Sequence, residues 1–178
     1  LLWAILVMIM VIGLAGLIID TGLGYMTGRQ LQDAADAASL AAAQKLGEEL
    51  DVIQSTAQAV GSMNYASAET ILLRLNPANS SDGDIVVGIY DRQARTFTPD
   101  LQNPNAVKVV SRRTEGSLGG PLPLLFGPIF GVNTINIERS AIAMVQTGRG
   151  DAAIIVLNRY DPRALDMDSN SRIRVING

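Results

Sequence analysis

Apolar residues fill the first nineteen positions of the chain, and the first ionisable side chain is Asp20. An apolar run of this length spans a lipid bilayer as an α-helix. The chain then passes through TGLGYMTG into RQLQDAADAASLAAAQKL, an alanine-rich stretch of high helix propensity. The pattern therefore predicts one long helix over residues 1–46, apolar at its start and amphipathic after it.

The alanine-rich part of this helix carries one apolar stripe. Its members recur at spacings of three and four residues, which is the period of a helix face: Leu31, Ala35, Ala38, Ala42 and Leu46. Arg29 with Asp33, and Gln32 with Asp36, form i, i+4 pairs on the polar side. We expect this narrow helix to pack closely, either onto a sheet of its own chain or onto the helix of a neighbouring subunit.

Small residues also mark the membrane end of the helix. Four glycines are candidates for helix packing, the last two spaced as GxxxG: Gly13, Gly16, Gly24 and Gly28. Glycines in membrane helices allow close helix–helix approach, so a packing role in an assembly is one interpretation. The other is that they only loosen the helix near the membrane surface. Trp3 is a candidate interfacial aromatic residue, and Asp20 is interpreted as a solvated residue at the opposite end of the run.

Gly47 is expected to interrupt the long helix, and residues 48–64 have the pattern of a second one. Residues 76–84, NPANSSDGD, have the composition of a loop. Residues 85–99 then indicate a β-hairpin around the turn DRQA. TILLRL, at 70–75, is compatible with a strand or a short helix.

Two later stretches alternate as strands do. In residues 106–113, Val107 and Val109 fall on one face and Lys108 on the other. Residues 134–146 are the longest predicted strand, and their second face changes from polar to apolar along the chain. We therefore expect that strand to pass from half-exposed to fully buried. Helices first and strands later predict an α+β fold with an antiparallel sheet.

The apolar segment 119–132, GGPLPLLFGPIFGV, contains three prolines and cannot be a regular central strand. A short helix from Pro121–Leu122 to Gly131 fits the pattern better. Its large side chains either cover the core or form an exposed surface for a partner. The candidate partner patch consists of Leu124, Leu125, Phe126, Ile129 and Phe130.

These patterns divide the chain into three parts. Residues 1–46 are the membrane helix and its continuation, and residues 47–147 are an α+β globular domain. Residues 148–178 are a strand-rich extension, which either adds to the sheet or begins a further module.

Composition limits the chemistry of this protein. The chain has no cysteine and no histidine, which excludes disulfides, thiolate chemistry, histidine acid–base catalysis and most zinc sites. A net charge of −3 does not favour nucleic acid as a partner. DMDSNS, at 166–171, has Ser171 where a calcium loop needs glycine and is interpreted as a polar turn.

The remaining charge pairs do not suggest a reaction. Asp33 and Asp36 share a helix face without a pocket or a proton-accepting partner. The pairs Asp82/Asp84 and Arg112/Arg113 are interpreted as loop and strand-surface charges. We therefore expect no catalytic residue, no metal, no cofactor and no enzymatic activity.

The block around the end of the apolar run resembles a known family. Its pattern is D-x-G-x-x-Y-x-x-x-x-x-L-Q-x-A-A-D-A-A-x-L, carried by Asp20, Gly22, Tyr25, Leu31, Gln32, Ala34, Ala35, Asp36, Ala37, Ala38 and Leu40. It resembles the TadE/TadG-like family of tight-adherence (Flp, type IVc) pilus proteins. A looser second set agrees with that family: Gly88/Tyr90/Asp91, Thr96/Phe97/Pro99, Asn105/Ala106/Val107/Val109, Pro121–Phe126 and Ala141/Ala143.

The resemblance covers about residues 1–147 and implies a membrane helix followed by an extracytoplasmic α+β domain. Members act in pilus assembly or as minor pilin-like parts of the pilus. Leu1 in place of methionine agrees with prepilin processing before the apolar helix, although pilins usually have Glu where this chain has Ile5.

We therefore expect a non-enzymatic, membrane-anchored, pilin-like protein that supports adhesion. Its expected location is the bacterial inner membrane or a cell-surface filament. Its expected partners are the lipid bilayer, other pilin-like or Tad pilus-assembly proteins, and further copies of itself through the N-terminal helix. The alternatives are a membrane-tethered adhesin outside any filament, and a membrane-bound enzyme or sensor domain.

Overall fold

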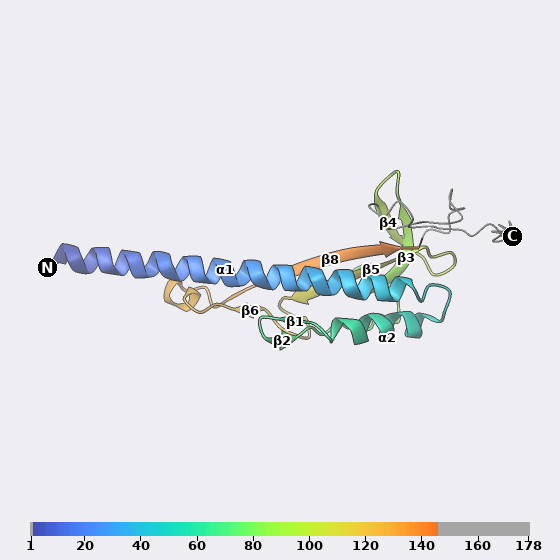
Figure 1. The fold of residues 1–178 in the computed structure, drawn as a ribbon, viewed down its shortest axis with the longest axis horizontal. Helices are drawn as coiled ribbons and strands as arrows, with labels where there is room; N and C mark the ends of the chain where they lie inside the picture. The colour runs from blue at the N-terminus through green and yellow to red at the C-terminus, as the bar shows by residue number, and fades with distance from the viewer. Residues whose placement is uncertain (1, 146–178) are drawn as a thin grey trace, which may run out of the picture. The chain divides into compact units, whose positions relative to one another are not determined.

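The computed structural model describes residues 2–145, which belong to one compact unit. Its elements follow the order helix, helix, then strands, so the predicted α+β class is confirmed (Figure 1). The predicted extension 148–178, with the turn at 166–171, lies outside the described residues.

Helix α1 runs without interruption over Leu2–Ala43. At 1.5 Å per residue its 42 residues are about 63 Å long. Beyond Ala43 the chain tightens, because the N–H groups of Lys45 and Leu46 donate to carbonyl groups only three residues back. Gly47 follows with φ +102°, a conformation that L side chains rarely adopt. The predicted interruption at Gly47 is therefore confirmed.

Helix α2 covers Leu50–Gly61 and packs against α1. Ala57 and Ile53 lie on its buried side. The helix ends at Gly61 rather than at the predicted Asn64. Leu73 packs closely on Gly61, since a Cβ added there would lie 2.7 Å from the end of the Leu73 side chain. The amide of Asn64 instead donates to the carbonyl of Val60 at 2.9 Å.

The main sheet has four antiparallel strands in the order β4-β3-β5-β8. Their bounds are Ile85–Asp91 for β3, Thr96–Pro99 for β4, Ala106–Arg113 for β5 and Ile137–Met144 for β8. The register places Val107 of β5 opposite Val87 of β3 and Ala143 of β8. The hairpin predicted over 85–99 is present as β3 and β4.

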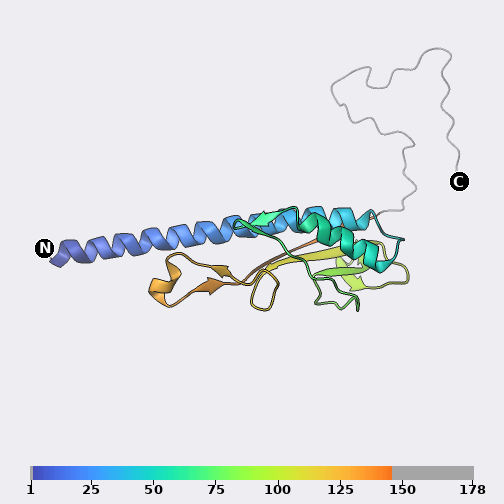
Figure 2. The same ribbon diagram turned by 90° about the horizontal axis from the view of Figure 1, so that it is seen from below.

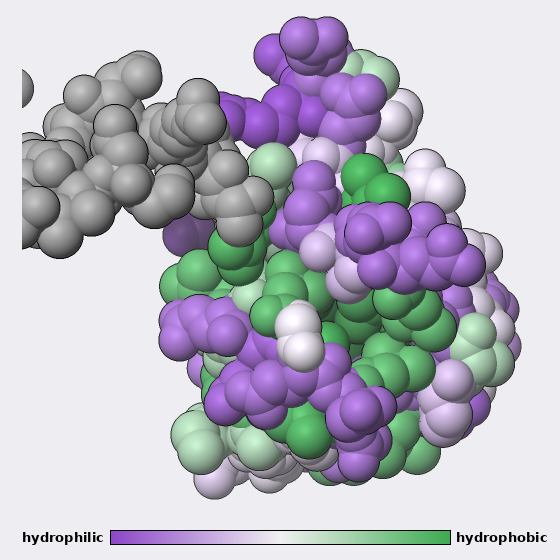
Figure 3. Space-filling model, turned by 90° about the vertical axis from the view of Figure 1, so that its right-hand side faces the viewer, coloured by the Kyte–Doolittle hydropathy of each residue, from purple (hydrophilic) through white to green (hydrophobic). Residues whose placement is uncertain are grey.

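The second half of α1 and helix α2 lie on one face of this sheet (Figure 2). The core between them joins alanines of α1 to branched residues of the strands. Its members include Leu31, Ala35, Ala38, Ala42, Ile53, Ala57, Ile85, Val87, Val107, Val109 and Ile137. The predicted alanine stripe therefore packs on the chain's own sheet. Figure 3 shows the end of the domain away from the start of α1, where hydrophilic residues surround a smaller hydrophobic area.

The loop at 76–84 is confirmed and is held by side-chain amides. Buried Gln54 exchanges two hydrogen bonds with the backbone of Asn76, at 2.6 and 2.8 Å. Asn79 does the same with the backbone of Val87, at 2.8 Å in each direction. These four bonds fasten the loop between α2 and β3.

Two small hairpins lie beside α1, away from the main sheet. Strands β1 (Tyr65–Ala66) and β2 (Glu69–Thr70) form the first. Strands β6 (Leu122–Pro123) and β7 (Thr134–Ile135) form the second, with the 3₁₀-helix η1 (Gly127–Phe130) at its tip. We call residues 122–135 the finger; Figure 2 shows it along the first half of α1.

Further local predictions differ from the structure. The single strand predicted over 134–146 is divided into β7 and β8, which belong to different sheets. The helix predicted from Pro121–Leu122 begins only at Gly127, because residues 122–123 pair with β7; its predicted end at Gly131 is correct. TILLRL forms neither helix nor strand beyond its first residue. The outer face of β8 does not become fully buried: Ile142 remains 41% exposed, because the two helices cover only the other face of the sheet.

Candidate membrane and assembly surface

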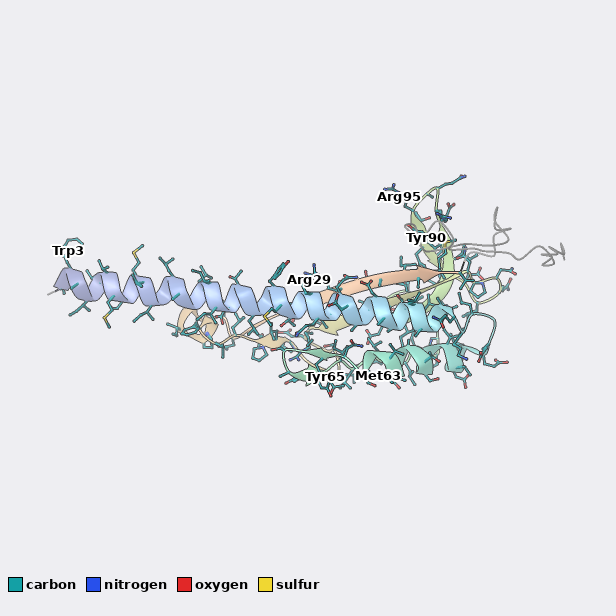
Figure 4. The ribbon with its side chains drawn as sticks, in the orientation of Figure 1. Trp3, Arg29, Met63, Tyr65, Tyr90 and Arg95 are labelled. Atoms are coloured by element: carbon teal, nitrogen blue, oxygen red, sulfur yellow. The ribbon has the colours of Figure 1, made fainter. Side chains whose placement is uncertain are left out.

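The first half of α1 presents large apolar side chains to the surroundings. Almost every position from Leu2 to Ile19 is exposed, and Trp3 is 81% exposed at the far end (Figure 4). The segment is long and apolar enough to cross a membrane. So large an exposed apolar surface is typical of contact with lipid or with other helices. This is the surface that the sequence predicts as a membrane helix.

One side of this helix is covered by the finger and, at Gly28, by the start of β8. The residues on that side recur every three or four positions and are small or short: Gly13, Gly16, Asp20, Gly24 and Gly28. Farther along α1, Leu31, Ala35 and Ala38 continue the stripe into the sheet-facing core. A single face of α1 therefore receives first the finger and then the sheet.

Two glycines of this face accommodate aromatic rings of the finger. A Cβ at Gly16 would lie 2.7 Å from the ring of Phe126, which is closer than real contacts allow. A Cβ at Gly13 would lie 3.4 Å from the ring of Phe130. The structure therefore places the side of Gly13 and Gly16 against the chain's own finger.

Gly24 and Gly28 accommodate side chains that follow the tip of the finger in the sequence. Gly24 lies beneath Ile135, and a Cβ added at Gly24 would lie 3.1 Å from the end of that side chain. Gly28 lies beneath the guanidinium of Arg139 in β8. Gly22 faces open space, because a Cβ added there would have no neighbouring atom within 4 Å.

Asp20 fastens the finger to α1. Its carboxylate accepts hydrogen bonds from three consecutive backbone N–H groups: Leu125 at 2.9 Å, Phe126 at 3.1 Å and Gly127 at 2.7 Å. The residue is only 6% exposed. Asp20 is therefore not the solvated end residue that the sequence suggests; it lies within the helix and fixes the first turn of η1. Hydrogen bonds to a charged group are the stronger kind.

The finger itself is apolar and only partly covered. Leu122 is completely buried in the core, and Phe126 packs against Gly16. Leu125, Ile129 and Phe130 are 69, 72 and 63% exposed. The segment therefore combines both interpretations that the sequence leaves open: its base joins the core and its tip is an exposed apolar surface.

A groove of about 530 Å³ lies between the tip of the finger and α1. Ile9, Gly13 and Leu17 contribute to one wall, and Phe126 and Phe130 to the other. Both walls are apolar, which suits an aliphatic or aromatic occupant rather than a polar one.

The family-motif residues divide between packing and surface. Leu31, Ala35 and Ala38 are fully buried. Gln32 donates from its amide to Asp36 at 3.0 Å and to the carbonyl of Ser140 at 3.3 Å. Gln32 therefore makes one hydrogen bond within α1 and one from α1 to β8. Tyr25, also in the motif, is 70% exposed.

Arg113 is a structural residue that the sequence interpretation places on the strand surface. Its side chain is almost fully buried and pairs with Glu69 at 2.6 Å. It also donates to the carbonyl groups of Gly120 at 3.1 Å and Ala66 at 3.4 Å. Arg113 therefore joins β5 to the β1–β2 hairpin and to the base of the finger. Its place on the same face as Val107 and Val109 is the signal that could have identified it.

Of the pair Asp82/Asp84, Asp84 is structural as well. Asp84 accepts the backbone N–H of Arg74 at 2.8 Å and lies 3.5 Å from Arg112. These groups line a polar hollow of about 380 Å³ beside the 76–84 loop. Within the described range, no group of three His, Cys, Asp or Glu side chains is arranged to hold a metal ion.

Comparison with known families accounts for residues 1–143. Residues 41–143 match the family model described as Tad-like Flp pilus-assembly, and residues 1–45 match the model described as Flp pilus-assembly TadE/G-like. Searches of curated proteins and of solved structures gave no match. The first model alone covers more than half of the chain, and the two meet near the end of α1. The resemblance stated from the motif is thereby confirmed, and the chain belongs to the Tad family of Flp pilus-assembly proteins.

Proposed function

We propose that this protein is a membrane-anchored, pilin-like component of a Tad/Flp pilus, acting in its assembly or entering it as a minor subunit, and so supporting adhesion. The observation that carries this proposal is the construction of α1. One continuous helix exposes only uncharged, mostly large apolar residues over Leu2–Ile19 and then becomes the central packing element of the globular domain.

The mechanism is mechanical. The exposed apolar surface of α1 holds the subunit in the inner membrane, with the domain on the extracytoplasmic side. Burial of that surface in lipid or among other helices supplies roughly 25 cal/mol per Å² of apolar area. The same helix fixes the height and orientation of the domain, because one face of residues 31–42 is buried against the sheet.

We further propose that the protein is not an enzyme. What supports this is the use made of three of its buried polar side chains. Asp20, Gln54 and Arg113 are each occupied by backbone partners that hold loops in place. A catalytic group needs a free hydrogen-bonding position directed at a substrate.

The test is to shear pili from cells and to measure the full-length protein in the sheared filaments and in the inner-membrane fraction. Recovery in filaments makes it a minor subunit, and recovery only in membranes makes it an assembly component. A strain lacking the protein should have fewer surface pili and attach less, and both defects should be restored by the wild-type chain.

Two results would contradict the proposal. Release of the protein into the soluble fraction would exclude the membrane anchor. Normal pili together with reduced attachment in the deletion strain would exclude the pilus role and favour the membrane-tethered adhesin.

A further inference from the structure

We propose that the finger is a second membrane-contacting element, which enters the leaflet next to the globular domain and shares the groove beside α1 with lipid acyl chains. The inference rests on the proposed anchoring of α1 and adds to it a contact made by a segment more than a hundred residues away. The protein would then contact the membrane through two elements, the apolar half of α1 and the finger.

The position of the finger along α1 carries the first step. Leu2–Ile19 is 18 residues, or about 27 Å of helix, which matches a hydrocarbon thickness of about 30 Å. Phe130 lies against Gly13, and the N–H groups of the finger reach Asp20. The seven residues between these two levels correspond to about 10 Å. A bilayer that covers the apolar run therefore also covers the tip of the finger.

The charge pattern carries the second step. From Gly116 to Ile137 the sequence contains no ionisable residue. The exposed large apolar side chains at the tip are Leu125, Ile129, Phe130 and Val132. Large apolar residues on an uncharged segment are what binds the interface and upper hydrocarbon of a bilayer.

The backbone of the finger carries the third step. Irregular backbone is tolerated at membrane depth only where its polar groups have protein partners. The Asp20 carboxylate accepts three of the tip's N–H groups, and carbonyl groups within the finger accept four others. The seven donors are Leu124, Leu125, Phe126, Gly127, Ile129, Gly131 and Val132. Pro128 has no N–H to satisfy.

The same contacts explain Asp20. An ionisable residue next to an apolar run is costly in a bilayer unless it is paired and shielded. Here the carboxylate is buried beneath the finger and surrounded by N–H donors. Asp20 and the finger therefore satisfy each other, and both can lie at the membrane boundary.

A second copy of α1 is the competing occupant of the groove. Close packing of membrane helices uses small residues at the contact. Of the small residues here, Gly16 is buried beneath Phe126, and Gly13 is partly covered by the ring of Phe130. The exposed walls of the groove are flexible or bulky apolar side chains, which suit acyl chains better than a helix backbone.

The experiment uses tryptophan fluorescence of the full chain in phosphatidylcholine vesicles, with bromine on the acyl chains as the quencher. Trp3 is the only tryptophan and is first changed by W3F. F130W and, independently, I129W then report on the finger. M8W reports on α1, and Y90W is the matched aromatic control at the far end of the domain (Figure 4). Circular dichroism and amide exchange of the sheet check that each variant is folded.

We expect F130W and I129W to lose as much fluorescence to brominated lipid as M8W, while Y90W loses none. Quenching of M8W without quenching of either finger variant would overturn the inference and leave the anchoring intact; shielding by a second copy would give this result. Absence of quenching in M8W as well would overturn the anchoring and the inference together.

Discussion

The role of the Asp20 carboxylate depends on residues that lie far from it in the sequence. By sequence, Asp20 is the first charge after an apolar run, which favours a solvated helix end. In the structure it binds N–H groups of residues 125–127, more than a hundred positions later. No local pattern predicts such donors, because η1 offers them only after the finger has folded back along α1. The surface position predicted for Arg113 is wrong too: strand alternation places it on the buried face, although its partners come from separate segments of the chain.

Replacement of Asp20 should release the tip of the finger. D20N keeps the size of the side chain but replaces one acceptor oxygen by a donor, which faces N–H groups. Loss of hydrogen bonds to a charged group costs about 1.5–3 kcal/mol, so the N–H groups of Leu125–Gly127 should exchange roughly 10- to 100-fold faster. The measurement is hydrogen exchange of the full chain in detergent micelles. D36N, farther along the same helix and without contact to the finger, is the control, and equal exchange in D20N and wild type would contradict the assignment.

Arg113 should be sensitive even to lysine. R113K keeps the positive charge but lacks the planar fork that reaches several acceptors at once. We expect the free energy of unfolding to fall by about 1–3 kcal/mol, since buried carbonyl groups lose their donor. Thermal unfolding of the full chain in detergent measures this. The control is R95K, at an exposed turn, which should leave the melting temperature unchanged. An equally small effect of R113K would show that the contacts of Arg113 do not stabilise the fold.

At the scale of elements, hydrophobic periodicity predicts the helices and strands that bury one face in the core. The alanine stripe of α1, the β3–β4 hairpin and the alternation of β5 are all present, because apolar period and element geometry coincide. The sequence identifies the finger only as an apolar, proline-rich segment. Its path depends on Gly16 of α1, which makes room for Phe126, and a glycine in a sequence does not reveal its partner. Sequence patterns do not show that the finger and the glycine face of α1, which are far apart in the chain, lie side by side in the fold.

The glycines of α1 should differ in their tolerance of alanine. G16A places a Cβ 2.7 Å from the Phe126 ring and should displace the finger, whereas Gly22 faces open space. We expect G16A to destabilise the chain by about 1–3 kcal/mol. G22A should be neutral or favourable, because alanine is the better helix former by about 0.5–1 kcal/mol. Thermal unfolding in detergent and pilus counts on cells test both variants, and identical behaviour would show that the finger does not depend on Gly16.

At the scale of the whole molecule, α1 is the element on which every other part is aligned. Its one face binds the finger through residues 13–24 and the sheet through residues 28–42. The two contacts have to keep the same rotational register around the helix. This demand explains why the family block, from Asp20 to Leu40, spans the junction between the apolar run and the alanine-rich stretch.

An added residue at the junction should separate the two contacts. One alanine inserted between Tyr25 and Met26 turns the first half of α1 by about 100° relative to the second. The sheet, with the larger buried surface, should keep its packing, while the finger loses Asp20 and the glycines. Hydrogen exchange of Leu125–Gly127 should then rise as in D20N, with the sheet amides still protected. An alanine inserted after Arg95 is the control; unchanged finger protection in the junction variant would contradict a shared register.

An uninterrupted helix between membrane and domain also acts as a lever. From Asp20 to Ala43 it is about 35 Å long, and it contains no proline or loop at which it would bend. A tilt of about 20°, ordinary for a single span, therefore carries the far end of the helix sideways by about 12 Å. Insertion of the finger into the bilayer, as proposed above, opposes this tilt. It gives the protein a second contact with the membrane, which fixes the rotation of α1 about its axis as well as its depth. Tension applied to the domain would thus reach the membrane as torque on α1 rather than as bending of a linker.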